Sequence, residues 1–463
     1  MNGQSQKRWV KPPEAKGGNA ERNSVGSSKA RSTEHRKRTT GSSTTELMEW
    51  LVARPNMEMA YKRVMANKGA AGIDGVGTDQ LHEYVWQHWE RIKRELLEGR
   101  YTPSPVKRVE IPKPNGGKRK LGIPTVIDRL IQQGLHQILT PIFEPTFSKH
   151  SYGFRPGKRA QQAITRAREY IEEGKRWVVD MDLEKFFDRV NHDILMERIR
   201  RRVKDERILK LIRKYLQAGI LEKGMLKASV EGTPQGGPLS PLLSNIMLTD
   251  LDRELERRGH RFCRYADDCN IYVQSEKAGQ RVLKSITRFI EQKLKLKVNQ
   301  EKSAVGRPWQ RKFLGYSFTS RLKTTIRIHE DSTCRLKRKI KSLLKIARGR
   351  DLEGFIRKTL KPILRGWTEY FKCTQSYSVL KKLDAWMTRR LRLLVWRSWS
   401  RAKVRLRKLV MGGVDPQDAF KTAYASTGPY RVSNFWTVRE ALPWQYFHER
   451  GLISMQALAR KRG

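Results

Sequence analysis

Two adjacent carboxylates are the residues of this chain best suited to chemistry. Asp267 and Asp268 lie between two short segments, Arg261–Arg264 and Cys269–Val273, that are rich in aromatic or β-branched residues. Such flanks predict two strands joined by a tight turn, so we expect a β-hairpin with both carboxylates at its tip. Adjacent carboxylates repel each other, and a divalent cation neutralises them best.

Asp182 is the candidate for a third metal ligand. It lies near the end of the apolar run Trp177–Leu183, which predicts a buried strand. Three carboxylates can hold two Mg²⁺ ions about 4 Å apart, an arrangement that activates a 3′-hydroxyl and stabilises a leaving pyrophosphate. An isolated Asp-Asp pair is more often an acidic surface turn, but the hairpin and the upstream strand-end Asp favour a metal site.

Two residues just after Asp182 have open assignments. Asp188 is either a fourth carboxylate of the metal site or a local structural acid. Phe187 is a packing aromatic by default. If Asp182 binds metal, Phe187 is instead placed to press on the sugar of an incoming nucleotide.

The charge balance identifies the class of partner. The 463 residues include 96 Lys and Arg against 47 Asp and Glu, a net charge of +49 spread along the chain. So large an excess predicts a folded surface for a polyanion, because without an anionic partner it repels itself. A membrane is excluded as the expected partner, since there is no run of about 18 apolar residues and no signal-peptide pattern.

Cysteine spacing argues against a zinc knuckle and against a disulfide framework. The four cysteines form no Cys-x-x-Cys pair. The expected location is therefore a reducing cytoplasm.

Two loops are candidates for nucleotide contacts. Strand-like segments at 106–112 and 119–124 flank a basic, Gly-containing tip, so Lys113, Lys118 and Arg119 can close over a triphosphate. The loop 231–242 is dense in helix breakers and places Gln235 before an apolar helix, a suitable position for a phosphate or a base pair. The alternatives are an ordinary solvated turn and a plain loop-to-helix junction.

The ends of the chain differ in character from its centre. Residues 1–44 are basic, with few large apolar residues, and predict a disordered leader. Segments 296–299 and 312–318 are strand-like. From residue 335 the pattern is helical and basic, with interleaved tryptophans of which we expect most to lie in the core. Basic helices with aromatic residues can track a nucleic-acid backbone and stack bases.

Taken in order, these segments resemble the reverse transcriptases encoded by bacterial group II introns, the maturases. The resemblance runs from about residue 46 onward and rests on five segments. They are motif A (179–188), motif B (232–242), the catalytic hairpin (265–268), the primer-grip region (313–316) and the thumb signature (364–371).

The resemblance implies an α+β right-hand polymerase with an antiparallel palm sheet and an all-helical thumb. The expected segments are a leader (1–44), an N-terminal extension (45–100), fingers and palm (101–325), a thumb or maturase domain X (326–400) and a DNA-binding domain (401–463). Many relatives carry a Cys- and His-rich endonuclease, and this chain shows no such cluster. We therefore expect the endonuclease-lacking type, similar to class C introns.

The resemblance also implies roles for individual residues. Asp182, Asp267 and Asp268 are the expected catalytic metal ligands, assisted by the Leu183 carbonyl, and they hold two Mg²⁺ ions for which Mn²⁺ can substitute. Phe187 resembles the gate that excludes a ribose 2′-hydroxyl. The expected contacts to the incoming nucleotide are Lys113, Arg119 and Gln235. The expected contacts to the nucleic acid are Arg365, Trp367, Arg389, Arg390 and Arg392.

The leading hypothesis is an RNA-directed DNA polymerase that binds its parent intron RNA and promotes splicing and retrohoming. Its expected partners are the intron RNA, an RNA template with a DNA or RNA primer, target DNA and dNTPs, in a bacterial cytoplasm near the nucleoid. Two alternatives stay open. One is a splicing maturase without a polymerase role, and the other is a reverse transcriptase co-opted for host defence or CRISPR spacer acquisition.

Overall fold

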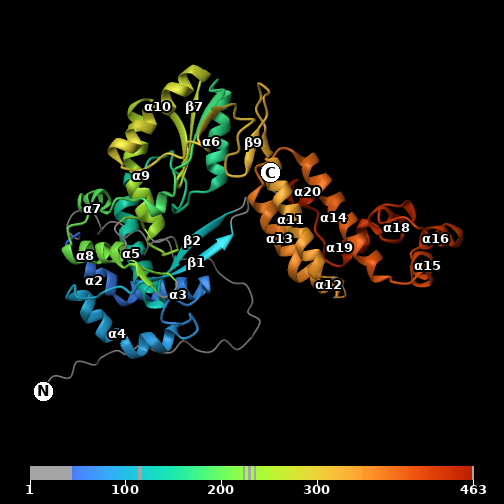
Figure 1. Ribbon diagram of the computed structural model, residues 1–463, viewed down its shortest axis with the longest axis horizontal. Coiled ribbons are helices and arrows are strands. Elements are labelled where there is room, and N and C mark those ends of the chain that lie inside the picture. Colours follow the sequence, from blue (N-terminus) through green and yellow to red (C-terminus); the bar gives the residue numbers. More distant parts are fainter. Residues whose placement is uncertain are drawn as a thin grey trace, which may run out of the picture. The chain divides into compact units, whose positions relative to one another are not determined.

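The computed structural model describes most of the chain (Figure 1). The described residues are 44–112, 117–222, 225–227, 231–233, 236–347, 349 and 351–460. The predicted leader, Lys113 and Gln235 therefore lie outside the described residues.

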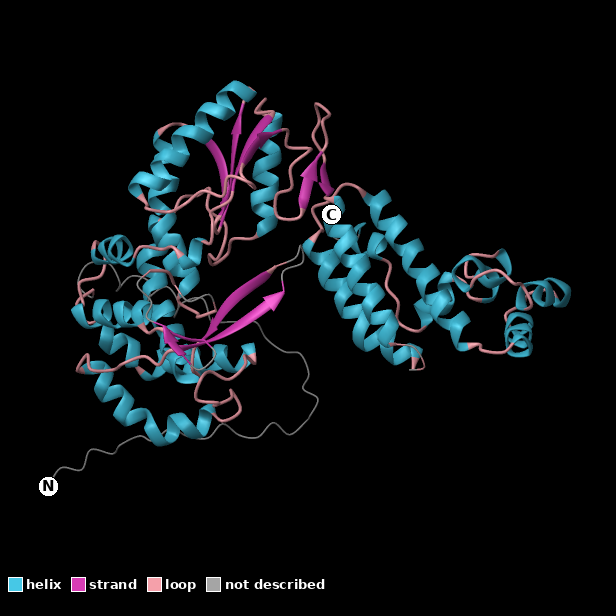
Figure 2. Cartoon of the chain, viewed as in Figure 1, coloured by secondary structure: helices cyan, strands magenta, loops and turns pink. Residues whose placement is uncertain are grey.

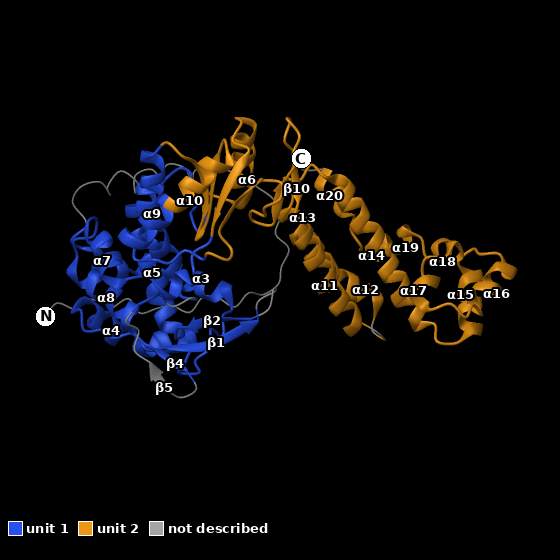
Figure 3. Cartoon of the chain, turned by 45° about the horizontal axis from the view of Figure 1, so that its top comes forward, with its two compact units in different colours: residues 1–156, 182–258, 285–299 blue, residues 157–181, 259–284, 300–463 orange. Residues whose placement is uncertain are grey.

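The chain divides into two compact units that interleave along the sequence (Figure 3). Unit 1 comprises residues 1–156, 182–258 and 285–299, and unit 2 comprises 157–181, 259–284 and 300–463. The predicted linear segments do not follow this division and stay a prediction.

Unit 1 is a helical body with one small sheet (Figure 2). In α4 (Leu81–Leu97) the apolar residues recur at helical spacing and are buried, which fixes one face of the helix against its neighbours. Its other helices are α2 (Leu47–Val52), α3 (Arg54–Asn67), α5 (Val126–Phe143), η1 (Glu144–Thr146), η2 (Phe186–Asp188), α7 (His192–Arg200), α8 (Glu206–Gln217), α9 (Ser240–Arg257) and the second half of α10 (Glu276–Lys293).

The close approach of α3 and α5 depends on a glycine. A Cβ atom at Gly134 of α5 would lie 2.8 Å from Leu51 Cδ1 and 3.2 Å from the Met57 sulfur. The absence of a side chain there lets α2 and α3 pack directly on α5, which is buried along most of its length.

The sheet of unit 1 has the strand order β2-β1-β4-β5. The hairpin predicted around a basic tip is confirmed: β1 (Val106–Pro112) pairs antiparallel with β2 (Lys118–Ile123). Strand β4 (Ile220–Glu222) continues the sheet in parallel with β1, and β5 (Met225–Lys227) follows it.

The main sheet of unit 2 has the strand order β6-β7-β3-β8. Its strands are β3 (Trp177–Met181), β6 (Arg261–Tyr265), β7 (Asp268–Val273) and β8 (Ala304–Gly306), and every pairing is antiparallel. Helix α6 (Ala160–Glu172) packs on β6 and β7. Gly279 of α10 lies so close to β8 that a Cβ atom there would meet Val305 Cγ1 at 2.6 Å. The predicted antiparallel palm sheet is confirmed.

One predicted strand is wrong, and another is shorter than predicted. The segment 296–299 forms no strand and makes only an isolated bridge between Leu183 and Val298. In the segment 312–318, Leu314 and Gly315 adopt positive φ angles of 51° and 83° and form a tight turn. Only β9 (Tyr316–Phe318) is a strand, and it pairs with β10 (Ile326–Ile328). Alternating side chains predict strands but do not reveal a left-handed turn inside them.

The rest of unit 2 is helical, as predicted (Figure 1). Helices α13 and α14 pack on the C-terminal helix α20, and α15, α16 and α18 form a separate cluster. The helices are α11 (Glu330–Ile346), α12 (Leu352–Phe355), the π-helical turn η3 (Ile356–Leu360), α13 (Lys361–Tyr370), α14 (Tyr377–Ser398), α15 (Ala402–Met411), α16 (Pro416–Ala423), α17 (Pro429–Val432), α18 (Trp436–Ala441), α19 (Trp444–Glu449) and α20 (Met455–Arg460). Among the helices of the described part, none combines the length and apolar character that crossing a bilayer requires.

Candidate active site

The β6–β7 hairpin presents two carboxylates at its turn, as the sequence predicts. Tyr265 pairs with Asp268, so Ala266 and Asp267 form the turn between the strands. Ala266 has a φ of 59°, a left-handed conformation that non-glycine residues rarely adopt. Both aspartates are half-buried. A strained turn of this kind costs on the order of 1–3 kcal/mol, and such strain often marks a functional site.

A buried arginine supports this turn. Arg264 is fully buried, and its Nη1 donates a hydrogen bond to the Ala266 carbonyl at 2.8 Å. Arg264 thereby fixes the turn residue that directly precedes Asp267. The sequence analysis did not identify Arg264, since an arginine within a strand carries no signal of burial.

The register of β3 against β7 locates the end of β3. Met181, the last residue of β3, pairs with Cys269, which directly follows Asp268. Asp182 is covalently next after Met181, so the chain emerges from β3 beside the strand that begins with Asp268. The preceding acid, Asp180, is held in an ion pair with Arg311 at 2.9 Å and has a structural role.

Within unit 1, the backbone after β3 is fixed by two hydrogen bonds. Asn299 N donates to the Asp182 carbonyl at 2.8 Å, and Glu184 N donates to the Lys297 carbonyl at 2.8 Å. These bonds flank Leu183, whose carbonyl is the expected backbone ligand. The Glu184 carboxylate forms ion pairs with Arg189 and with Lys297.

The donor set fits a hard divalent cation in its chemistry, because Mg²⁺ prefers carboxylate and carbonyl oxygens. Among the described side chains, no three His, Cys, Asp or Glu residues form a group placed to hold a metal ion. Asp182 belongs to unit 1, and Asp267 and Asp268 belong to unit 2.

Phe187 lies in η2 and is half-buried, with its ring against Phe186 at a centroid distance of 5.2 Å. Its carbonyl accepts a hydrogen bond from Thr233 N at 2.6 Å, which attaches the start of the motif B segment to motif A. Gly232 has a φ of 94°, and a Cβ there would lie 2.9 Å from the Phe187 carbonyl oxygen, so this close approach requires glycine. Asp188 is exposed.

His192 stabilises the same junction. Its Nε2 lies 2.7 Å from the Gly232 carbonyl, and Gly232 N donates to the Val190 carbonyl at 2.8 Å. Burial lowers the pKa of His192 despite this hydrogen bond. The neutral imidazole therefore donates to the Gly232 carbonyl at neutral pH.

The basic hairpin presents one of its predicted nucleotide contacts within the described residues. Arg119 lies on β2 opposite Ile111 and is exposed. Lys118 is held by an exposed ion pair with Glu110 at 2.6 Å.

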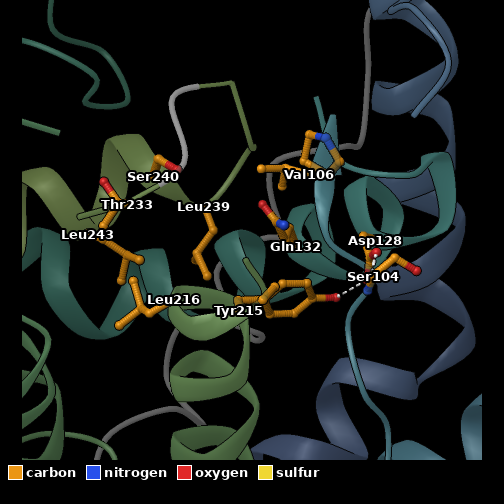
Figure 4. A pocket seen from close by; sticks show the side chains of 12 residues that line it. Ser104, Val106, Asp128, Gln132, Tyr215, Leu216, Thr233, Leu239, Ser240 and Leu243 are labelled. Carbon is orange, nitrogen blue, oxygen red and sulfur yellow. Dashed lines mark hydrogen bonds between the residues drawn. The ribbon is translucent and has the colours of Figure 1, made fainter. Parts of the chain in front are cut away.

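A buried hydrogen-bond network centred on Asp128 supports the base of this hairpin (Figure 4). Tyr101 and Tyr215 donate to Asp128 Oδ1 at 2.8 and 3.1 Å, and Ser104 N and Thr125 Oγ1 donate to Oδ2 at 3.1 and 2.7 Å. Burial raises the pKa of Asp128, and these hydrogen bonds oppose the rise. The sequence analysis missed this network, although Thr125-x-x-Asp128 carries the pattern of a helix capping box.

A small cavity adjoins the Asp128 network. Its volume of about 20 Å³ suffices for one water molecule. Thr233 lines it, and among the described residues the buried Thr233 hydroxyl has no hydrogen-bond partner. The cavity is too small for a nucleotide, so we assign it to packing.

The predicted nucleic-acid contacts lie on two helices of unit 2. Arg365 is exposed on α13, and Trp367 is half-buried against Phe371 at 4.6 Å. Arg389, Arg390 and Arg392 are half-buried on α14. The expectation that most tryptophans of this region lie in the core is wrong. Of the four on α13, α14 and the residue after α14, only Trp396 is buried, and Trp367, Trp386 and Trp399 are half-buried.

Tyr370 connects the end of α13 to the primer-grip turn. Its hydroxyl donates to the Leu314 carbonyl at 2.9 Å, and its own carbonyl accepts hydrogen bonds from Tyr316 and Gln161. Burial raises the pKa of Tyr370, and the nearby Tyr265 and Asp268 raise it further. The C-terminal end of α13 therefore lies near the hairpin residues Tyr265 and Asp268.

Comparison with known proteins agrees with this geometry. Residues 111–318 match the reverse transcriptase (RNA-dependent DNA polymerase) family, and residues 333–411 match the group II intron, maturase-specific domain. Protein YkfC of Escherichia coli is 35% identical over 297 residues, which are 56% of this chain and 76% of that protein. The chain belongs to the group II intron type of reverse transcriptase.

Two other relatives are named for introns. The group II intron-encoded protein LtrA of Lactococcus lactis is 32% identical over 350 residues, which are 61% of this reverse transcriptase but 58% of LtrA. The nuclear intron maturase 1 of Arabidopsis thaliana is 27% identical over 34% of the chain and 29% of that protein. The chain thus spans three quarters of YkfC and less than two thirds of LtrA.

Likeness to solved structures is weaker. A partial Cas6-RT-Cas1–Cas2 complex has a TM-score of 0.35 at 25% identity, over 53% of this reverse transcriptase and 42% of that chain.

Reverse transcriptases generally use a divalent metal, and the two matched domains imply nucleic-acid partners such as an RNA template.

Proposed function

We propose that this chain copies RNA into DNA at a site formed by Asp182, Asp267 and Asp268. The observation that carries the proposal is the register of β3 against β7, in which Met181 pairs with Cys269. In this register, the residue that follows β3 (Asp182) and the residue that begins β7 (Asp268) both carry carboxylates. Three acids drawn from distant parts of the sequence are otherwise an unfavourable combination, because like charges repel.

The residues that would hold a pair of Mg²⁺ ions are these three aspartates and the Leu183 carbonyl. Bound ions would activate the primer 3′-hydroxyl and stabilise the leaving pyrophosphate. The protein's own contribution is to fix the carboxylates. Arg264 donates a hydrogen bond to the Ala266 carbonyl of the hairpin turn, and the backbone pairing of 182–184 with 297–299 fixes the segment after β3.

The incoming dNTP would lie against residues of unit 1. Phe187, whose backbone is fixed by Thr233 N, is suited to exclude a ribose 2′-hydroxyl by its bulk. Arg119 on the exposed hairpin is suited to contact the triphosphate, together with Lys113 and Gln235, which lie outside the described residues. A guanidinium suits this role because its planar fork matches phosphate oxygens.

The helical part of unit 2 would bind the parent intron RNA and the target DNA, and so support splicing and retrohoming. The basic excess supports this proposal: residues 335–400 contain 19 Lys and Arg against 4 acids. Binding by such a surface depends on salt, with a slope of roughly −0.9 per phosphate neutralised on duplex DNA and about −0.7 on single strands. A flat salt response would contradict this part of the proposal.

Primer extension on an RNA template with Mg²⁺ tests the polymerase. We expect the unaltered protein to extend a DNA primer and Asp267→Ala to lose about 10²-fold or more in rate, as expected when a charge-stabilising group is removed. Asp193→Ala is the matched control, since Asp193 is an exposed acid outside the proposed site. Synthesis that survives Asp267→Ala overturns the site.

A splicing maturase without a polymerase role is the second candidate. It is favoured by one observation, the match of residues 333–411 to the group II intron, maturase-specific domain. Intron splicing that persists when all three aspartates are replaced, with no synthesis by the unaltered protein, would support it.

A further inference from the structure

A groove in the C-terminal helical part of unit 2 has the lining of a nucleotide-binding site. Its volume is about 640 Å³ and it opens to solvent. Helix α14 forms one wall, and α17, α19 and α20 pack against α14 to form the others. The volume lies within the range of about 300–1,000 Å³ that small-molecule sites occupy in proteins. We call it the α14 groove.

The α14 groove is cationic and lacks a neutralising acid. Its cations are Lys381, Arg389, Arg392 and Arg439. The only carboxylate in the lining, Asp384, accepts hydrogen bonds from Ser454 Oγ and from two backbone amides at the start of α20. Asp384 therefore caps a helix. Within the described residues, no ion pair joins the three arginines of the groove to an acid.

Two of these arginines share one charge environment. Arg392 is half-buried, and its Nε donates to the Leu442 carbonyl at 2.8 Å. Burial lowers the pKa of Arg392, and the positive charge of Arg439 lowers it further. Two guanidinium groups that repel each other beside a cavity are stabilised when an anion binds between them.

Aromatic side chains complete the lining. Arg389 stacks on the Tyr430 ring at 4.0 Å, and its Nη2 donates to the Tyr430 carbonyl at 3.1 Å. Trp386 and Trp444 are half-exposed at the groove. Aromatic rings and arginine planes beside phosphate-binding cations are the means by which proteins hold unstacked bases of single strands.

We propose that the α14 groove binds one unstacked nucleotide of a single-stranded nucleic acid, with its phosphate between Arg392 and Arg439 and its base against Trp444. The proposal rests on the proposed function, which supplies the nucleic acid. A base within a duplex is stacked on its neighbours and cannot lie against Trp444, so the groove selects single strands over duplexes.

The experiment measures fluorescence anisotropy of fluorescein-labelled oligo(dT) and oligo(U) with the full chain at fixed salt. We expect Arg439→Gln, Lys381→Gln and Trp444→Leu each to weaken single-strand binding by roughly tenfold, the loss typical of one stacking or charge contact. Arg407→Gln and Trp436→Leu are the matched controls. They remove the same charge or ring from exposed positions outside the groove and are expected to leave the affinity unchanged.

Comparing the groove variants with their controls distinguishes the possible modes of binding. If the groove variants and their controls weaken binding equally, the groove is only part of a diffuse basic surface and the proposal is overturned. If Trp444→Leu matches Trp436→Leu while the charge variants lose affinity, the site binds phosphate without a base, which also overturns it. Lys381 and Arg439 are exposed, so their variants test the groove even if Trp444→Leu unfolds. Failure of the unaltered protein to extend a primer would instead contradict the proposed function.

Discussion

Met181, the last residue of β3, pairs with Cys269, the residue that follows Asp268. This pairing joins two parts of the sequence that lie nearly ninety residues apart. It places the end of β3 beside the start of β7, the strand that begins with Asp268. Variants of the residues that stabilise this arrangement should therefore change activity or stability.

Arg264 is predicted to stabilise the turn that precedes Asp267. Arg264→Lys keeps the positive charge but loses the guanidinium fork that holds the Ala266 carbonyl. We expect a lower kcat, by about tenfold, and a loss of roughly 1.5–3 kcal/mol in stability, because a buried charged hydrogen bond is removed. Steady-state primer extension and thermal unfolding measure the two effects. Arg261→Lys, exposed on the same strand, is the control, and equal effects at the two positions would argue against a role for Arg264.

Phe187 is predicted to control the choice of sugar. Phe187→Ala removes the bulk that would exclude a 2′-hydroxyl, so discrimination between dNTP and rNTP should fall by at least about tenfold. The ratio of kcat/KM for the two nucleotides, taken from single-nucleotide incorporation, measures this. Trp86→Ala removes an exposed aromatic of α4 and should leave the ratio unchanged. An unchanged ratio in Phe187→Ala would show that Phe187 does not exclude the ribose 2′-hydroxyl.

Gly315 is predicted to fix the junction between the primer-grip turn and α13. Its φ is 83°, and an added Cβ would lie 3.0 Å from Ser332 Oγ and 3.2 Å from the Phe371 ring. Gly315→Ala should therefore cost about 1–3 kcal/mol. Leu314→Asn is the comparison, because Leu314 also has a positive φ and asparagine tolerates that conformation. Urea unfolding should show the larger loss for Gly315→Ala, and equal losses would contradict this interpretation.

Stability should fall as the pH is lowered from about 7.5 to 6. Burial lowers the pKa values of His136 and His192, so the unfolded chain binds protons more readily than the folded one in this window. The stabilisation is present above the unfolded pKa of about 6.5 and is lost as the pH falls toward the lowered folded pKa. Thermal unfolding at several pH values measures this. His192→Gln should flatten the dependence, and an unchanged slope would exclude His192 as a contributor.

The sequence was sufficient to predict elements whose signal is local. The Ala-Asp-Asp turn, its two flanking strands and the basic hairpin follow from alternation and turn chemistry. The Asp128 network could not be predicted in the same way. Its tyrosine partners lie 27 and 87 residues from it, and a single sequence carries no record of that proximity.

The remaining errors have a shared cause. The turn at Leu314 and Gly315 interrupts a run that alternates like a strand, and a leucine in the left-handed region is tolerated only because the surrounding contacts hold it. The half-buried tryptophans Trp367, Trp386 and Trp399 were likewise assigned to the core, because they lie on the apolar faces of their helices. Both errors concern tertiary contacts, which local patterns do not encode.

The central claim is that Asp182, Asp267 and Asp268 hold the same metal ions. Fe²⁺ bound in place of Mg²⁺ reduces added hydrogen peroxide to hydroxide and a hydroxyl radical, with ascorbate regenerating Fe²⁺; the radicals cut the backbone close to the ion, and the fragments can be mapped by mass spectrometry. We expect cuts near residue 182 and near residues 267–268, with both sets lost together in Asp182→Asn. Cuts at the hairpin that persist at full strength in Asp182→Asn would show that the acids do not share a metal site, and the account would be wrong.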